Sequence, residues 1–266
     1  MGRIESCFES LRSKGEKGLI TFITAGDPSI ENTLDYMQSL VDGGTDVIEL
    51  GVPFSDPMAD GPTIQRASER SLAAGTDLSS IFMLVRAFRE RNASTPVILM
   101  GYMNPFERLG FERFAKEARA SGVDGVLVVD LPPEESVPQN KILTLNGIRQ
   151  IFLIAPNSSE DRIKKVGELA AGFIYYVSVK GVTGDKSIST SNIRNSLELV
   201  RNGTRLPIGL GFGIKTPESA REAAKLSDAV VVGSALVDII EKETEVNAAK
   251  KALESFVKEL KGAVDA

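Results

Sequence analysis

The feature that most constrains the fold is a regular alternation of short apolar segments with longer amphipathic stretches. The apolar segments are rich in Val and Ile and nearly continuous in hydrophobicity, as in strands that are covered on both faces, which favours parallel pairing. There are eight of them: 18–24, 46–51, 96–102, 124–130, 149–155, 172–178, 207–213 and 228–234.

Helical patterns occupy the connections between these segments, and some carry start signals such as Asp77 and Pro217. Eight strand–helix units in 266 residues predict an α/β fold of the (β/α)₈ barrel type as a single domain over 1–266. A doubly wound sheet is the alternative, but a lone Gly26 follows the first strand instead of a glycine fingerprint. The predicted helices cover 2–13, 30–42, 62–74, 77–91, 110–121, 133–145, 158–169, 189–202, 216–225, 234–242 and 244–261.

The helix at 2–13 precedes the first strand, and we expect it to close the bottom of the barrel. Some connections between strands contain two helical patterns instead of one, such as 62–74 and 77–91. We therefore expect extra helices beyond the eight of a plain barrel.

Composition narrows the chemistry, chiefly because the chain has no histidine. The commonest general base, the Ser-His-Asp arrangement and most zinc sites are therefore excluded, and acid–base work falls to Asp, Glu, Lys, Tyr or Cys. The 31 basic and 36 acidic residues are spread along the chain and give a net charge of −5. No basic stripe exists that could neutralise a nucleic acid.

Composition and the first residues also indicate the cellular location of the protein. Apolar residues make up 42% of it, yet no apolar run approaches the length of a membrane span. Its charged, amphipathic start lacks the features of a secretory signal, and the single Cys7 fits a reducing compartment. We expect a cytoplasmic protein that does not enter a membrane.

Two acids near the end of the second predicted strand are the best candidates for chemistry. Glu49 lies between Ile48 and Leu50, so alternation turns it to the opposite face, into the barrel mouth, where poor solvation raises a carboxyl pKa. Its alternative is an ion pair on the helix side. Asp60 follows in a loop stiffened by Pro53, Pro57 and Pro62, which favours a fixed second acid over a helix cap. Asp56, in the same loop, is interpreted mainly as a turn residue.

Glycine turns after the last three strands predict an anion site. Gly211 and Gly213 follow the seventh strand, Gly233 and Ser234 follow the eighth, and Gly184 follows the sixth. Barrels bind phosphate at this place, because backbone N–H groups and a helix N-terminus meet there. Apolar and aromatic residues at mid-strand or strand-end positions could enclose a flat hydrophobic group between the acids and this site: Phe22, Met100, Leu127, Tyr175 and Phe212.

The motifs resemble those of the alpha subunit family of tryptophan synthase over nearly the whole chain. The segment "ELGVPFSDPMADGPTIQRA" (49–67) is similar to the family signature almost position for position. "TAGDP", "GYMNP", "DLPPEE", "GVTG", "GFGI" and "VVGSA" follow the family order. The resemblance implies a (β/α)₈ barrel that cleaves indole-3-glycerol phosphate to indole and glyceraldehyde 3-phosphate, in tryptophan biosynthesis, without metal or organic cofactor.

The resemblance also assigns roles to residues. Glu49 would protonate C3 of the indole and later assist removal of the glycerol hydroxyl proton, while Asp60 would stabilise positive charge on the indole N–H. A lid is implied at 179–189, where Val179 replaces the Arg of some relatives. The other implied assignments are Tyr175 and Thr183 as residues that order the acids, Gly184, Gly213, Gly233 and Ser234 as phosphate site, and Phe22, Met100, Leu127 and Phe212 as indole pocket.

The partner implied by the resemblance is the beta subunit, a pyridoxal-phosphate enzyme, in an α₂β₂ heterotetramer. Pyridoxal phosphate would belong to that partner. The docking face implied for this chain comprises Pro53, Asp56, Asn104 and Pro132.

Three other functions are considered. One is a Schiff-base aldolase that uses Lys180 or Lys215, although an exposed surface lysine is the plainer interpretation of each. Another is a degenerate alpha subunit that only activates its partner, against which the intact Glu49 and Asp60 argue. The third is an indole-producing lyase that works without a partner.

Overall fold

The expected strands close into a single parallel barrel in a computed structural model of the chain, which describes residues 2–178, 190–211 and 213–266. Each strand pairs with the next, and β1 also pairs with β8, with Leu19 opposite Val230. This closure confirms the (β/α)₈ barrel and excludes the doubly wound sheet, whose edge strands stay unpaired. The strands are β1 (Gly18–Thr24), β2 (Val47–Gly51), β3 (Val97–Gly101), β4 (Gly125–Val128), β5 (Arg149–Ile154), β6 (Ile174–Val177), β7 (Ile208–Gly211) and β8 (Ala229–Val232).

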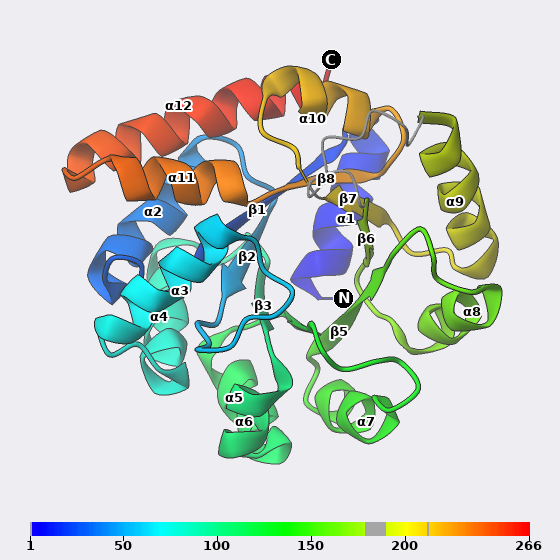
Figure 1. Ribbon diagram of the computed structural model, residues 1–266, viewed down its shortest axis with the longest axis horizontal. Coiled ribbons are helices and arrows are strands. Elements are labelled where there is room, and N and C mark those ends of the chain that lie inside the picture. The colour runs from blue at the N-terminus through cyan, green and yellow to red at the C-terminus, as the bar shows by residue number, and fades with distance from the viewer. Residues whose placement is uncertain (1, 179–189, 212) are drawn as a thin grey trace.

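Apart from α1, the helices form an outer ring around the barrel (Figure 1). Their starts follow local signals: Asp77 and Ser80 form a capping box, and Thr216 caps the helix that has Pro217 in its first turn. Among the described residues, no helix is long and apolar enough to cross a membrane. The helices are α1 (Arg3–Lys14), α2 (Ile30–Asp42), α3 (Pro62–Ala73), α4 (Leu78–Arg91), α5 (Met103–Leu109), α6 (Phe111–Ser121), α7 (Val137–Leu145), α8 (Glu160–Leu169), α9 (Thr190–Gly203), α10 (Pro217–Ala224), α11 (Ser234–Lys242) and α12 (Val246–Val264).

Two helix predictions need correction. A short helix, α5, was not expected; it forms after β3, and the Asp130 carboxylate accepts a hydrogen bond from its first N–H, at Met103 (2.7 Å). The helix predicted from residue 133 begins only at Val137. Its predicted first turn is instead a separate turn, in which the Glu135 N–H bonds to the Pro132 carbonyl.

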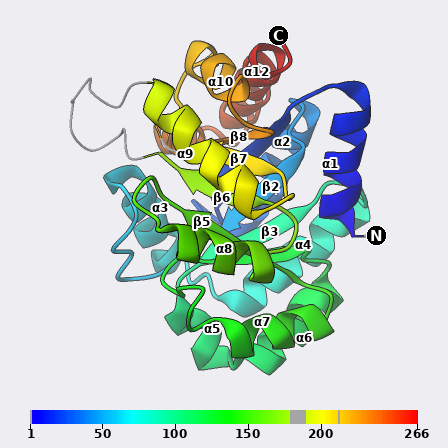
Figure 2. The same cartoon turned by 90° about the vertical axis from the view of Figure 1, so that its right-hand side faces the viewer.

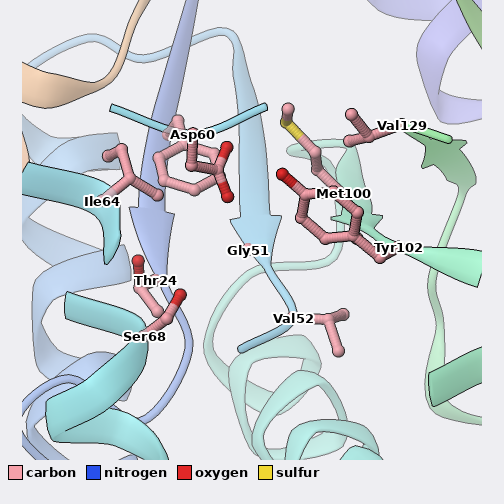
Figure 3. A pocket seen from close by; sticks show the side chains of 11 residues that line it. Thr24, Gly51, Val52, Asp60, Ile64, Ser68, Met100, Tyr102 and Val129 are labelled. Atoms are coloured by element: carbon pink, nitrogen blue, oxygen red, sulfur yellow. The ribbon is translucent and has the colours of Figure 1, made fainter. Parts of the chain in front are cut away.

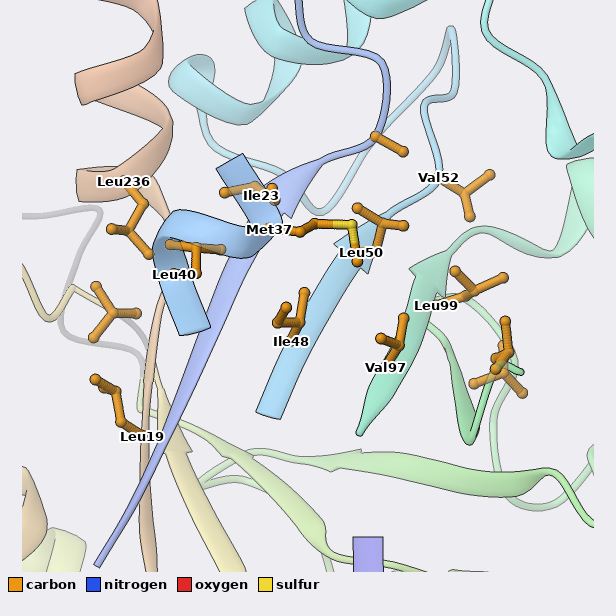
Figure 4. Close-up of a cluster of buried hydrophobic side chains, with 14 of the residues drawn as sticks. Leu19, Ile23, Met37, Leu40, Ile48, Leu50, Val52, Val97, Leu99 and Leu236 are labelled. Atoms are coloured by element: carbon orange, nitrogen blue, oxygen red, sulfur yellow. The ribbon is translucent and has the colours of Figure 1, made fainter. Parts of the chain in front are cut away.

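Alternate strand residues face two different layers. Outward-facing Leu19, Ile48 and Val97 pack with helix residues such as Met37 and Leu40 of α2 in the main core (Figure 4). The inward-facing residues form a second cluster inside the barrel, which includes Ile20, Val47, Ile98, Leu127, Ile151, Phe173, Ala229 and Val231.

Helix α1 closes the amino end of the barrel, as expected. Ile4, Phe8 and Leu11 belong to the inner cluster, and the Phe8 and Phe173 rings are 5.7 Å apart. Figure 2 shows α1 at one end of the barrel. The carboxyl ends of the strands, at the other end, are left for a site.

Candidate active site

Glu49 lies on the inner face of β2, level with Phe22 of β1 and Ile98 of β3. Its side chain is fully buried, and neither carboxylate oxygen has a hydrogen-bond partner in the described part of the chain. The alternative of an ion pair on the helix side is therefore wrong. Burial raises the pKa of Glu49 to about 8, because the ionised form loses its hydration without gaining a partner. Such a carboxyl holds a proton at neutral pH and can deliver it.

Asp60 lies in the loop between β2 and α3, where its N–H bonds to the Pro57 carbonyl at 3.0 Å. Gly61 and Pro62 follow as N-cap and first residue of α3. Burial raises the pKa of Asp60 to about 6, while a hydrogen bond with the Tyr102 hydroxyl lowers it. At neutral pH the two acids are therefore expected in opposite states, with Glu49 protonated and Asp60 ionised.

A small cavity of about 10 Å³ lies beside Asp60 at the carboxyl ends of β1 to β4 (Figure 3). Its volume suits about one water molecule. The Thr24 hydroxyl is buried there without a hydrogen-bond partner among the described residues. The cavity is lined by Phe22, Thr24, Gly51, Val52, Asp60, Ile64, Ser68, Met100, Gly101, Tyr102 and Val129.

Two inner-face glycines make room for aromatic rings. A Cβ at Gly51 would lie 2.5 Å from the Phe22 ring, and one at Gly211 would lie 2.6 Å from the Tyr175 hydroxyl. Burial raises the pKa of Tyr175 well above its usual value, and the Glu49 and Asp60 carboxyls raise it further. Tyr175 therefore lies within electrostatic reach of both acids.

The glycines after β7 and β8 adopt different backbone conformations. Gly213 has φ +74°, a left-handed conformation that favours glycine. Gly233 is the N-cap of α11, which begins at Ser234. The first N–H groups of α11 are thus at the carboxyl end of the barrel, where a phosphate could accept hydrogen bonds.

Several predicted site residues stand apart from this cavity. Leu127 is fully buried in the inner cluster with α1 and does not line the cavity. Lys215 is exposed after β7, as expected of a surface lysine. Outside the described residues are Thr183, Gly184, Phe212, Lys180 and the predicted lid 179–189.

The residues predicted for a docking face surround the same mouth. Asp56 is exposed and accepts a hydrogen bond from Ser55, Asn104 is exposed on α5, Pro132 is half-buried before α7, and Pro53 is buried. A groove of about 350 Å³ runs beside Asp56. Met58, whose side chain is 80% exposed, lines this groove.

Sequence reasoning selected only three cavity residues, Phe22, Asp60 and Met100. It missed Thr24, Gly51, Val52, Ile64, Ser68, Gly101, Tyr102 and Val129. Thr24, Tyr102 and Val129 lie at or just after strand ends, so the rule that barrel sites form there could have selected them. Ile64 and Ser68 come from α3, and no sequence pattern places that helix over the mouth. In the described ranges, no group of three or more His, Cys, Asp or Glu residues could hold a metal ion.

The fold and the site define a class: a barrel enzyme with one fully buried acid and a second acid in the loop above it, at the carboxyl ends of its strands. The family model for the tryptophan synthase alpha chain matches residues 8–265. The chain belongs to the tryptophan synthase alpha chain family. The alpha subunit of this family is a lyase that cleaves indole-3-glycerol phosphate to indole in tryptophan biosynthesis. It needs no cofactor, and pyridoxal phosphate belongs to the beta subunit.

Individual relatives agree with this family. The tryptophan synthase alpha chain of Burkholderia thailandensis is 53% identical over 265 residues, covering 100% of this chain and 97% of the relative. The subunit alpha structure from Legionella pneumophila has a TM-score of 0.93 at 39% identity, covering 100% of this chain and 99% of that chain. A chain of the Pyrococcus furiosus tryptophan synthase α₂β₂ complex has a TM-score of 0.85 at 40% identity, covering 93% and 99% respectively.

Proposed function

We propose that Glu49 and Asp60 carry the cleavage of indole-3-glycerol phosphate in this chain. The single observation that supports it best is Glu49, a fully buried carboxyl without a partner among the described residues, whose pKa burial raises to about 8. A carboxyl in this state exchanges a proton readily near neutral pH. Ordinary buried acids are paired, because an unpaired charge in the interior is costly.

The proton moves in two steps. Glu49 donates its proton to C3 of the indole, and Asp60 stabilises the positive charge that spreads to the indole N–H. The bond between C3 and the glycerol carbon then breaks, and its electron pair returns to the indole. Glu49, now ionised, takes the proton of the glycerol hydroxyl as that carbon becomes the aldehyde. The products are indole and glyceraldehyde 3-phosphate, and Glu49 ends protonated again.

The two ends of the substrate are proposed to bind to different parts of the barrel mouth. The phosphate is proposed to lie at Gly184, Gly213, Gly233 and Ser234, supported by the open N-terminus of α11. The indole is proposed to contact Phe22, Met100, Leu127 and Phe212, and the lid 179–189 to cover it. Tyr175 and Thr183 are proposed to order the acids, supported at Tyr175 by its electrostatic interaction with Glu49 and Asp60.

The proposed partner is the beta subunit, in an α₂β₂ assembly. Support comes from the Pyrococcus furiosus α₂β₂ complex and from the exposed Asp56 and Asn104 beside the mouth. Pro53 and Pro132 are proposed to belong to the same face. We also propose one domain over residues 1–266 and a cytoplasmic location, the latter supported by the single Cys7.

The decisive experiment measures indole release from indole-3-glycerol phosphate by the wild type and by Glu49→Gln, with chelator present. The variant is expected to lose turnover by at least about a hundredfold, in the range of general acid–base catalysis, and still to bind substrate. Glu222→Gln, which changes an exposed glutamate of α10, is the matched control. Near-normal turnover in Glu49→Gln would overturn the proposed role. Adding the beta subunit to the wild type then separates a partner-dependent enzyme from a stand-alone lyase.

A further inference from the structure

Tyr102 connects the end of β3 to the loop that carries Asp60. Its side chain is buried, and its hydroxyl accepts a hydrogen bond from the Ala59 N–H at 3.0 Å. Its ring packs on Phe54 of the same loop, with 5.4 Å between centroids. Two separate contacts therefore hold the loop, one at Phe54 before its turn and one at Ala59 within the turn.

The backbone beside Tyr102 is itself fixed. Tyr102 is the N-cap of α5, and the next N–H, at Met103, donates to the Asp130 carboxylate at 2.7 Å. A side chain anchored in this way can set the position of the loop instead of following it.

The Tyr102 hydroxyl also faces Asp60 across the cavity, and Figure 3 shows the two groups turned toward one another. A tyrosine hydroxyl has one proton and two lone pairs. Because Ala59 donates to the oxygen, the proton remains available for the Asp60 carboxylate. The Tyr102 hydroxyl lowers the pKa of Asp60 against the effect of burial.

We propose that Tyr102 is a positioning residue for the cleavage reaction: its hydroxyl fixes the Asp60 carboxylate at the cavity and stabilises its ionised form. The proposal rests on the function proposed above for Asp60. Other titratable groups act on the same pair, since Glu49 and Asp60 both interact with Tyr175, and Asp130 interacts with Tyr102. None of them reproduces the direct contacts of Tyr102 with the loop at Ala59 and Phe54.

The first test is Tyr102→Phe, which removes the hydroxyl and keeps the ring on Phe54. We expect kcat to fall on the order of tenfold or more, since a hydrogen bond to a charged group is lost, with a smaller change in KM. The acid limb of kcat/KM against pH is expected to move to higher pH, because Asp60 ionises less readily without its donor. A ¹³C NMR titration of the Asp60 carboxyl should show the same upward movement.

The matched control is Tyr176→Phe. Tyr176 is a fully buried tyrosine of β6 that packs in the outer core, away from the cavity. Its variant is expected to keep the wild-type pH profile. If Tyr102→Phe had the same kcat, acid limb and NMR titration as Tyr176→Phe, the proposal would be refuted.

A second variant tests the proposal independently, in case Tyr102→Phe does not fold. Fluorinated tyrosine at position 102 keeps the ring and hydroxyl but donates a stronger hydrogen bond, so the acid limb and the Asp60 titration should both move to lower pH. Movement in the same direction as Tyr102→Phe, or no movement, would contradict the proposal. The NMR titration needs no turnover, so an inactive wild type would overturn the proposed function while this measurement still decided the role of Tyr102.

Discussion

At the scale of single residues, the presence or absence of an arginine partner distinguishes buried acids that stabilise the fold from those available for catalysis. Asp27 and Asp124 are also buried, but Asp27 is bonded by Arg70 and Asp124 by both Arg3 and Arg89. Glu49 has no such partner in the described part of the chain. An acid that the fold leaves unpaired at a barrel mouth is a candidate for function, because burial without pairing reduces stability.

The opposite states of Glu49 and Asp60 predict a bell-shaped pH dependence. Activity should rise as Asp60 ionises, with a pKa of about 6, and fall as Glu49 loses its proton, with a pKa of about 8. The measurement is kcat/KM for indole-3-glycerol phosphate from pH 5 to 9, which reports groups of the free enzyme. A flat profile over this range would contradict the assignment.

The raised pKa of Glu49 also predicts how stability depends on pH. In the unfolded chain Glu49 ionises near 4.5, whereas in the folded chain it holds its proton up to about 8. The folded state therefore binds more protons in this window, and the stability that Glu49 contributes is present below 4.5 and lost as pH rises to 8.

Glu49→Gln removes this dependence, because the amide does not titrate. Urea unfolding at pH 5 and pH 8 measures the free energy of unfolding of both proteins. Relative to the wild type, the variant should be more stable at pH 8 than at pH 5, by several kcal/mol at most. Equal differences at the two pH values would contradict the burial of an unpaired carboxyl.

At the scale of elements, α3 joins the two ends of the site. It begins just after Asp60 and packs beside α11, which begins at the proposed phosphate site. Arg70 of α3 bonds to both carboxylate oxygens of Asp27, at 2.8 Å, and to Glu241 of α11. Arg70 lies near the end of α3 and Glu241 near the end of α11, so this bond joins the two helices at their carboxyl ends.

Arg70→Gln should destabilise the fold by about 1 to 2 kcal/mol. It leaves the buried Asp27 carboxylate without its cation, and solvent screening reduces the loss because the Arg70 side chain is 31% exposed. Lys225→Gln, which breaks an exposed pair with Glu222, should cost less than about 0.5 kcal/mol. Urea unfolding measures both, and equal effects would argue against Arg70 as a structural link.

At the scale of the whole molecule, stability and chemistry occupy opposite ends of the barrel. Helix α1 fills the amino end through Ile4, Phe8 and Leu11, and ion pairs such as Arg3 with Asp124 attach it there. The acids, the cavity and the start of α11 are at the carboxyl end. Changes at the amino end should therefore alter stability without altering catalysis.

Phe8→Ala tests this separation. It should reduce the free energy of unfolding by about 3 kcal/mol or more, because a buried ring is replaced by a cavity. Below the unfolding temperature, kcat and KM should stay at wild-type values. Glu9→Ala, on the exposed side of the same helix, should change stability by less than about 0.5 kcal/mol. A loss of kcat in folded Phe8→Ala would show that the two ends are coupled.

The strands and the acid at position 49 were predictable because their signals are local. Continuous Val and Ile runs identify buried parallel strands, and alternation within "VIELG" places Glu49 inside. Ile64 and Ser68 were not predictable as site residues, since their place in the cavity depends on how α3 packs over the strand ends. The start of α7 was misplaced because a separate turn at Pro132 replaces the expected helical turn.

The sequence by itself determined the barrel and the closing helix at its amino end, and it predicted Glu49 and Asp60 as the two acids, because strand burial, helix periodicity and motif order are local properties of the chain. Only the tertiary structure decided that Glu49 has no partner among the described residues and that Tyr102 and Phe22 share a cavity with Asp60. Solvation and pairing depend on residues distant in sequence, so no local pattern specifies the pKa of an acid.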